Sequence, residues 1–416
     1  MKSVLRTLHR WCGLITAVFL IISGVTGSLL AFEHELDAWL NPELYYTGSS
    51  QPAQPVQPVQ PALAANRLIE QIEANEPRIR VSQLPLDAKP GSAIEVQVEP
   101  RMPQSPTGFN RLWVDPATGR ILGHRTWGVW QGDRAHFMPW LNRFHRSLTL
   151  PGRTGHQLLG AVAMAWLAMS LTGLYLTLPA RIKRKASAPQ AAPHYWSRWR
   201  PAWRIQWKAR GFRWVNDLHR ATGLWLLAIA LCSAFTGVYL NLGNEVFKPV
   251  VSWFGSITAH PLTTLPTSAK PRPPTLIDPE QSIELARALL PEGARGYVPW
   301  YVSHLPTRSA YRVAFKENGF REHAFRSGYE QIFIDDQTGQ LLAQTGYESG
   351  TPADRFLIWM YPVHSGKLLG LSGRVLIAVS GVLLALLCGA GLVRFWMRRQ
   401  LGQQQRGQAR KAEQRR

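Results

Sequence analysis

Residues 8–27 read LHRWCGLITAVFLIISGVTG, and residues 218–237 read LHRATGLWLLAIALCSAFTG. The two stretches align without a gap at a constant offset of 210 residues. They share the opening Leu-His-Arg, the glycine at the sixth position, the serine at the sixteenth and the closing Thr-Gly. Because a chance match at so many positions of one helical frame is rare, the pattern predicts an internal repeat.

Four stretches of the chain are almost purely apolar and contain no charged residue. Each is close to the ~20 residues that a helix needs to cross roughly 30 Å of hydrocarbon. The first could instead be a secretory signal peptide, but its apolar run is long, no Ala-x-Ala site follows it, and it has a later counterpart in the chain. We therefore expect four transmembrane helices, at Gly13–Phe32, Leu158–Leu178, Leu224–Leu242 and Val375–Val393.

The basic residues of the chain are concentrated in three segments, which are the first ten residues, residues 181–213 and residues 394–416. The positive-inside rule places these segments in the cytoplasm and the two long segments, about 33–155 and 243–372, in the periplasm. We therefore expect a multi-pass protein of the bacterial inner (cytoplasmic) membrane with both termini cytoplasmic. The formal net charge of +21 lies beside the membrane rather than on a soluble domain, so no nucleic-acid partner is expected.

The two long segments also resemble each other. Residues 113–122 (WVDPATGRIL) and 333–342 (FIDDQTGQLL) each predict a β-hairpin with an Asp-x-x-Thr-Gly turn. Further strands are expected at Ala93–Val98 and Ala310–Lys316, amphipathic helices at Leu63–Glu73 and Pro279–Leu290, and extended proline-rich linkers at Gln51–Pro61 and His260–Pro274.

The predicted fold is a membrane protein with four transmembrane α-helices in two parallel repeats, each a helix, a small periplasmic α+β domain and a second helix. A pseudo-two-fold axis would then run along the membrane normal. The expected layout is 1–40 helix 1, 48–135 domain 1, 145–180 helix 2, 181–215 a basic aromatic cytoplasmic loop, 216–243 helix 3, 260–350 domain 2, 364–397 helix 4, and 398–416 a basic cytoplasmic tail.

Several histidines lie at predicted membrane boundaries, where ionisable groups are often functional. His9 and His219 are repeat equivalents at the cytoplasmic ends of helices 1 and 3, and His145 and His364 are equivalents beside the periplasmic ends of helices 2 and 4. Two imidazoles can hold one haem iron, so two symmetric pairs predict a two-haem relay across the bilayer.

Two further histidines are candidate haem ligands, and the boundary histidines also have a simpler interpretation. His34 and His156 lie near the periplasmic boundary, but their repeat equivalents are Asn244 and Arg374, so they are unpaired candidates for haem ligands. The alternative is that boundary histidines anchor helices to the headgroups and that the glycines of the helices only permit close packing. No catalytic acid or base is identified.

The electron donor is not encoded in the chain. Dinucleotide-binding, Walker and familiar protease motifs are all missing. The donor would be another protein, a quinone, or a weakly bound pyridine nucleotide or flavin. The loop at 181–215 interleaves tryptophans with basic residues, which favours a segment lying on the inner leaflet over a docking site for such a donor.

Four short motifs resemble the PepSY-associated transmembrane helix family, and the two Asp-x-x-Thr-Gly hairpins resemble PepSY domains. The motifs are Leu8-His9-Arg10-Trp11, Thr26-Gly27, Phe144-His145-Arg146-Ser147-Leu148 and Leu171-Thr172-Gly173-Leu174-Tyr175. Members of this family are iron-regulated inner-membrane proteins, and some are haem-containing enzymes that reduce ferric siderophores, such as an inner-membrane ferrioxamine reductase.

The resemblance implies two b-type haems held by His9, His219, His145 and His364, and a ferric siderophore as electron acceptor. Reduction to Fe(II) would weaken the hold of hard oxygen ligands and release the iron for uptake. Two other functions stay open. The protein could be a membrane-tethered regulator of a periplasmic protease, without a cofactor, or an accessory protein in siderophore or metal transport.

Overall fold

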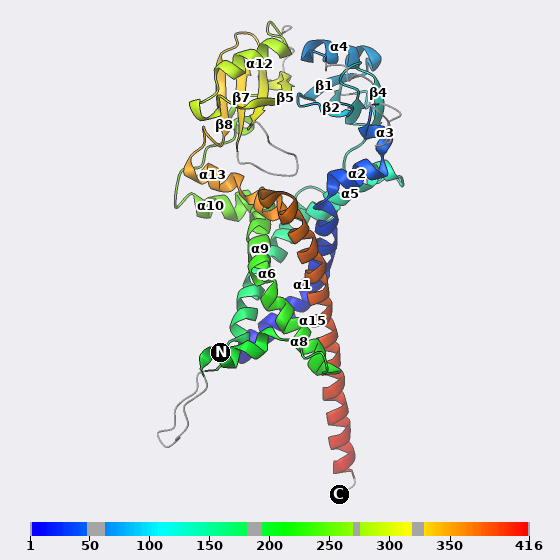
Figure 1. Ribbon diagram of the computed structural model, residues 1–416, viewed down its shortest axis with the longest axis vertical. Coiled ribbons are helices and arrows are strands. Elements are labelled where there is room, and N and C mark those ends of the chain that lie inside the picture. The colour runs from blue at the N-terminus through cyan, green and yellow to red at the C-terminus, as the bar shows by residue number, and fades with distance from the viewer. Residues whose placement is uncertain are drawn as a thin grey trace.

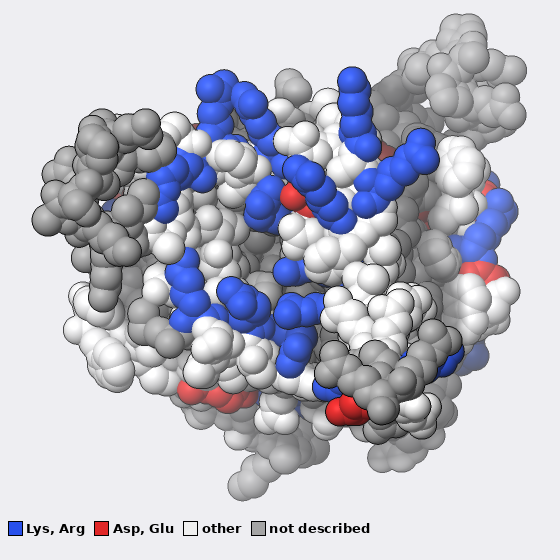
Figure 2. Space-filling view, turned by 90° about the horizontal axis from the view of Figure 1, so that it is seen from below, with Lys and Arg blue, Asp and Glu red and all other residues white. Residues whose placement is uncertain are grey.

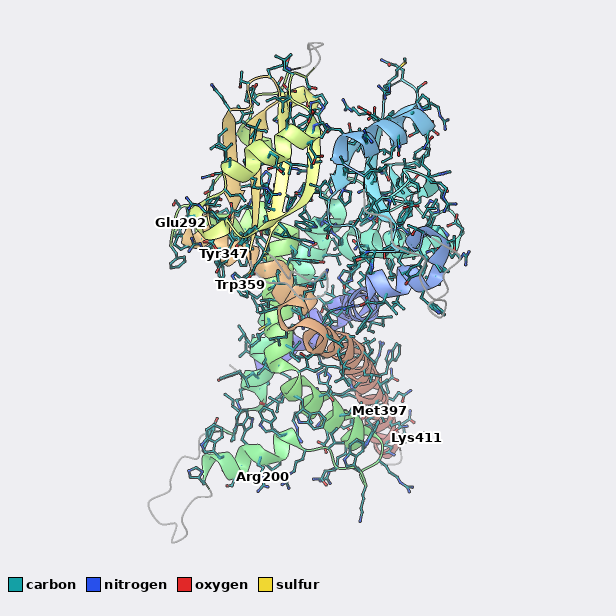
Figure 3. All side chains as sticks on the ribbon, turned by 45° about the horizontal axis from the view of Figure 1, so that its top comes forward. Arg200, Glu292, Tyr347, Trp359, Met397 and Lys411 are labelled. Carbon is teal, nitrogen blue, oxygen red and sulfur yellow. The ribbon has the colours of Figure 1, made fainter. Side chains whose placement is uncertain are left out.

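The computed structural model describes residues 2–47, 63–102, 104–180, 194–268, 275–317 and 328–414. Figure 1 shows a bundle of long helices that carries a β-sheet domain at one end, with both chain termini at the other end. We call these two ends the sheet side and the terminal side. In Figure 3, Trp359 lies where the sheet domain meets the bundle, and Met397 lies on the terminal side.

The predicted four membrane helices are confirmed among the described residues. The segments long and apolar enough to cross a membrane are Lys2–Leu30, Thr154–Thr177, Leu227–Val251 and Lys367–Gln408. They belong to α1 (Lys2–Leu30), α6 (Thr154–Thr177), α9 (Leu227–Leu242) with the short helices that follow it, and α15 (Gly370–Glu413). The chain is thus a multi-pass membrane protein. The last helix continues through most of 398–416, where the sequence predicted only a basic tail.

Glycines allow the helices to pack closely. Gly24 of α1 faces Gly381 of α15, and a Cβ added to Gly24 would lie 2.5 Å from the Gly381 carbonyl oxygen. On the other side of the bundle α6 packs against α9, where Gly237 lies next to Ala163. Such contacts between small residues hold helices together in lipid, where burial of apolar surface gives no net driving force.

The described strands form one eight-stranded sheet in the order β4-β3-β2-β1-β5-β6-β7-β8. Every neighbouring pair is antiparallel, and each half of the chain supplies four consecutive strands. The strands are β1 (Ile79–Pro85), β2 (Ile94–Pro100), β3 (Arg111–Val114), β4 (Ile121–Arg125), β5 (Val298–Leu305), β6 (Ala310–Lys316), β7 (Tyr329–Asp335) and β8 (Leu341–Gly346).

The sheet corrects the prediction of two separate α+β domains. The halves join where β1 pairs with β5, through Leu84 opposite Val302 and Pro85 opposite Tyr301. One shared core lies between the sheet and two helices, α4 (Ala65–Asn75) and α12 (Pro279–Ala288). A single hydrophobic core therefore spans both halves.

The amino-terminal ends of α4 and α12 supply hydrogen-bond acceptors for each other's backbone amides. The Ala65 backbone amide of α4 donates to Glu280 Oε2 at 3.0 Å, and the Glu280 amide of α12 donates to Asn66 Oδ1 at 2.9 Å. Amides at the start of a helix have no partner within the helix, so each helix supplies the missing acceptor for the other. This reciprocal contact ties the two halves together on the helix-covered face of the sheet.

The predicted hairpins are confirmed. Asp115 accepts a hydrogen bond from the Thr118 hydroxyl at 2.9 Å between β3 and β4, and Asp335 accepts one from Thr338 at 3.0 Å between β7 and β8. The glycine that ends each turn has a positive φ, 68° at Gly119 and 71° at 339, where a side chain would be strained.

The proline-rich linkers are only partly described. Gln51–Pro61 and the end of the second linker, 269–274, lie outside the described residues. The prediction that His260–Pro274 is extended is wrong at its start, because α11 (Pro261–Thr264) is a helical turn. His260 begins that turn by accepting a hydrogen bond from the Leu262 amide.

Two different junctions connect the sheet to the bundle. In the first half Asp37 of α2 is buried and binds Arg125 of β4 at 2.8 Å. The residue at the corresponding place in the second half, 210 residues later, is Phe247, which packs against Phe235 and Phe356. One junction is therefore ionic, and the other is aromatic.

The remaining elements connect the bundle, the junctions and the sheet. They are α2 (Glu33–Leu40), α3 (Pro42–Tyr45), α5 (Arg134–Ser147), α7 (Tyr195–Trp199), η1 (Arg200–Trp203), α8 (Phe212–Trp225), η2 (Gly243–Phe247), α10 (Lys248–Val251), η3 (Glu292–Ala294), η4 (Pro306–Arg308), α13 (Pro352–Ile358), α14 (Met360–Ser365) and η5 (Lys367–Leu369).

Candidate functional site

Two histidines from different halves of the chain face each other on the terminal side of the bundle. His9 belongs to α1, and His219 belongs to α8. The centroids of the two imidazole rings lie 6.4 Å apart, and the ring planes make an angle of 75°. We call these residues the terminal-side pair.

A second pair lines a cavity on the sheet side of the bundle. His145 of α5 and His364 of α14 both border this cavity, which has a volume of about 440 Å³. Many of its lining residues are repeat equivalents, such as Ser23 with Ser233 and Gly27 with Gly237. The walls are mainly apolar, and the polar lining residues include Glu33, Asn142, Arg146, His156, Asn241 and Tyr361.

The imidazoles of this sheet-side pair are held in one orientation by threonine hydroxyls. His145 Nδ1 lies 2.8 Å from Thr26 Oγ1, and His364 Nδ1 lies 2.9 Å from Thr236 Oγ1. Each threonine donates its own hydroxyl proton to the carbonyl four residues earlier, at 2.7 Å in both cases. The hydroxyl oxygen therefore accepts a hydrogen bond from Nδ1–H. This tautomer leaves the Nε2 lone pair available for a metal.

The terminal-side pair is held in the same tautomer by different groups. His219 Nδ1 donates to the backbone carbonyl of Leu387 at 3.1 Å, and a carbonyl can only accept. His9 Nδ1 lies 3.3 Å from Thr172 Oγ1, whose proton goes to the Met169 carbonyl at 3.1 Å. Among the described residues, Nδ1 is thus the hydrogen-bonded nitrogen of all four histidines and Nε2 has no such bond. In metal sites such outer partners fix the ligand orientation.

Each imidazole also packs against a glycine of a neighbouring helix. At three of these glycines an added Cβ would lie 3.2 Å from the ring Cε1, and at the fourth 3.9 Å. A side chain at the first three positions would push the ring away from its place. The contacts join Gly173 with His9, Gly391 with His219, Gly27 with His145 and Gly237 with His364.

The terminal-side pair fits a bis-imidazole haem iron. Two imidazoles bound through nitrogen at about 2 Å to one metal have ring centroids about 6 Å apart. The observed 6.4 Å between His9 and His219 agrees with that spacing. The chemistry of the donors agrees as well, because Nδ1 is the hydrogen-bonded nitrogen of both rings and Nε2 is the nitrogen left to bind a metal.

The two pairs lie near opposite ends of the membrane helices. His9 and Gly27 are 18 residues apart on α1, which is a rise of about 27 Å. Because Gly27 packs against His145, this rise also approximates the separation of the two pairs. It is close to the hydrocarbon thickness of a bilayer, roughly 30 Å.

The structure separates His156 and His34, the two candidates whose repeat equivalents are not histidines. His156 lines the sheet-side cavity together with His145 and His364. His34 is not among the residues that line this cavity, and its ring packs against Tyr45 with centroids 5.3 Å apart. Arg374, the repeat equivalent of His156, is buried and binds Glu35 at 2.6 Å, so it has a structural role.

Sequence reasoning found the histidines but missed the groups that orient them. Thr26 and Thr236 recur at the same place in the two halves, and a threonine in an apolar span is a polar group that needs a partner. Thr172 likewise precedes a glycine in an apolar span, as Thr26 and Thr236 do, whereas the Leu387 carbonyl has no sequence signal. The residue equivalent to Thr172 is Ala390, so the repeat itself breaks at this position.

A family model described as PepSY-associated TM region matches residues 6–399. A search of curated proteins finds no match to the chain. The family match covers both histidine pairs and the sheet domain.

Proposed function

The chain belongs to the PepSY-associated TM region family, and from this membership and its two histidine pairs we propose that it is a haem-containing reductase of the bacterial inner membrane. It passes electrons across the membrane to ferric siderophores in the periplasm. The observation that carries the proposal is the 6.4 Å spacing of the His9 and His219 rings, with the Nδ1 atoms of all four histidines already engaged.

The proposed orientation of the protein in the membrane follows from the distribution of its basic residues. The terminal side carries most of the basic residues that flank the membrane helices, and the positive-inside rule makes it cytoplasmic. The sheet domain is then periplasmic, and the two halves are repeats related by an axis along the membrane normal. In this orientation electrons enter near His9 and His219 and leave near His145 and His364.

Haem, when bound, supplies one-electron transfer, because its iron cycles between two oxidation states. The residues of the protein would bind the haem, orient it and surround it. The four Nε2 atoms would hold the iron, and Thr26, Thr236, Thr172 and the Leu387 carbonyl would keep the imidazoles in the ligating tautomer. The mainly apolar walls of the sheet-side cavity would surround the haem at one of the two proposed sites.

The joined sheet bears on where the ferric siderophore, the proposed electron acceptor, would bind. Because β1 pairs with β5, the described strands of the two halves form one sheet rather than two separate domains with a siderophore between them. We therefore place the ferric chelate at the outer edge of the sheet-side cavity, where the lining residues Arg146 and Tyr361 are exposed. One-electron reduction there converts the bound Fe(III) to Fe(II), for which hard oxygen ligands have lower affinity.

A reduced-minus-oxidised spectrum of the purified full-length protein tests the proposal. We expect a spectrum of six-coordinate b-type haem and a haem-to-protein ratio of two, with re-oxidation of the haem on addition of a ferric hydroxamate. A protein that is folded but lacks a haem band after expression with adequate haem contradicts the proposal. Co-purification of a protease with such a protein would support the regulator alternative.

Replacing Thr236 by valine removes the acceptor for His364 Nδ1–H without changing the size of the side chain. The unpaired buried N–H and the loosened ring are expected to weaken haem binding about 10- to 100-fold at the sheet-side site. Haem titration of the apoprotein measures the change. Thr236→Ser keeps the hydroxyl and should bind as the wild type does. Equal losses in both variants would show that the hydroxyl has no such role.

A further inference from the structure

Arg394 lies beyond the terminal-side pair, closer to the chain termini. Gly391 of α15 touches the ring of His219. Arg394 lies three residues further along α15, on the same helical face and about 5 Å closer to the terminal end. Arg6 has the matching place on α1, three residues before His9. Both arginines therefore belong to the helix faces that carry the histidine site.

The charged groups with the strongest influence on Arg394 are all positive. Its strongest charged neighbours are Arg398, Arg6 and Arg220, and Arg394 itself acts on both His9 and His219. Asp217, the nearby acid, is buried and bound to Arg220 at 2.9 Å. Arg394 is partly buried, and it has no hydrogen bond or ion pair within the part of the chain that the structure describes.

The chain supplies no other counter-charge at this end. Residues 1–12 contain no acidic residue, residues 178–226 contain only Asp217, and residues 392–416 contain only Glu413. Glu413 is 19 residues beyond Arg394 on the same helix, about 28 Å away along the axis. Figure 2 shows this end of the molecule, with many more Lys and Arg side chains than Asp or Glu.

A partly buried guanidinium surrounded by other cations is unfavourable unless an anion joins it. Haem brings two carboxylates on one edge of its ring, and arginine binds carboxylates through two parallel hydrogen bonds. Other arginines near this site are either exposed to solvent or already paired with a carboxylate. Arg398 and Arg399 are exposed on the same helix, and Arg220 already has a carboxylate partner.

We propose that Arg394, supported by Arg6, binds the carboxylates of the haem that His9 and His219 hold. This inference rests on the proposed function. It assigns a direction to the ring, with the carboxylate edge toward the chain termini. It also assigns a positive charge that favours the reduced state of this haem over the oxidised state.

The test uses the full-length chain with His145→Ala and His364→Ala, so that only the terminal-side site remains. The apoprotein is titrated in detergent with haem and with haem dimethyl ester, in which both carboxylates are blocked. We expect Arg394→Gln to bind haem about tenfold more weakly than its parent, and to bind the ester as its parent does. Arg394→Lys should keep part of the preference for haem, and Arg399→Gln is the exposed control on the same helix.

The midpoint potential provides a second measurement. Arg394→Gln should lower the potential of the terminal-side haem, whereas Arg399→Gln should leave it unchanged. Equal weakening for haem and ester would show that Arg394 only supports the fold. No change for either would mean that its anion is something else, such as a lipid phosphate or the phosphate of a donor. Both results overturn the inference. Failure of the parent chain to bind any haem would instead overturn the proposed function.

Discussion

Replacing His219 by alanine is expected to leave a protein with one haem in place of two. His219 and His9 face each other at 6.4 Å, so loss of either ring removes one axial ligand from the same iron. His145→Ala should remove the other haem, because His145 lies about 27 Å away along the bundle. Pyridine haemochrome analysis of the purified variants measures the ratio.

Double variants test directly which two histidines bind the same haem. His9→Ala with His219→Ala should hold as much haem as either single variant, because the two ligands act as one unit. His9→Ala with His145→Ala should hold none. The exposed His194 is the control, and His194→Ala should retain two haems. Different pairing, for example joint loss in His9→Ala with His364→Ala but not with His219→Ala, would contradict the assigned sites.

Replacing Asp37 by alanine is expected to lower the free energy of unfolding by about 3–5 kcal/mol. Asp37 accepts hydrogen bonds from Tyr45 at 2.7 Å and Asn41 at 2.8 Å, and it pairs with Arg125 at 2.8 Å. The side chains of Asp37 and Arg125 are only 5% and 3% exposed. Without the carboxylate of Asp37, the buried guanidinium over the Trp113 ring keeps only the more distant carboxylate of Glu95, at 3.8 Å.

A surface ion pair of the same sheet provides the control for Asp37. Glu99 binds Arg80 at 2.7 Å, but its side chain is 55% exposed. Glu99→Ala should therefore change the free energy of unfolding by less than about 1 kcal/mol. Denaturant unfolding in detergent, followed by tryptophan fluorescence, compares the two variants. Equal effects would show that the buried pair contributes no more than an exposed one.

The sequence predicted those parts of the fold whose signals are local. Four apolar runs identified the membrane helices, and the turn at Asp115 identified its hairpin from a few adjacent residues. Repeat symmetry paired His9 with His219 and His145 with His364, because an offset is visible without any contact information. These signals depend on neighbours in the chain or on self-similarity.

The features that the sequence did not predict depend on contacts between distant residues. Leu84 and Pro85 carry no sign that they meet Val302 and Tyr301, because short antiparallel strands pair through backbone groups that every residue has. Asp37 and its partner Arg125 are similarly far apart in the chain. Their burial appears only after α2 and the sheet have packed together.

The pairing of β1 with β5 also bears on the ancestry of the chain. A single unit of helix, four strands and helix would expose β1 as an open sheet edge, and it would own only one histidine of each pair. Open edges recruit other strands, and a twofold dimer closes such an edge with a copy of itself. A half-length ancestor would therefore have assembled as a symmetric homodimer, and gene fusion would have made that partnership permanent while freeing each copy to diverge, as Asp37 and Phe247 have done.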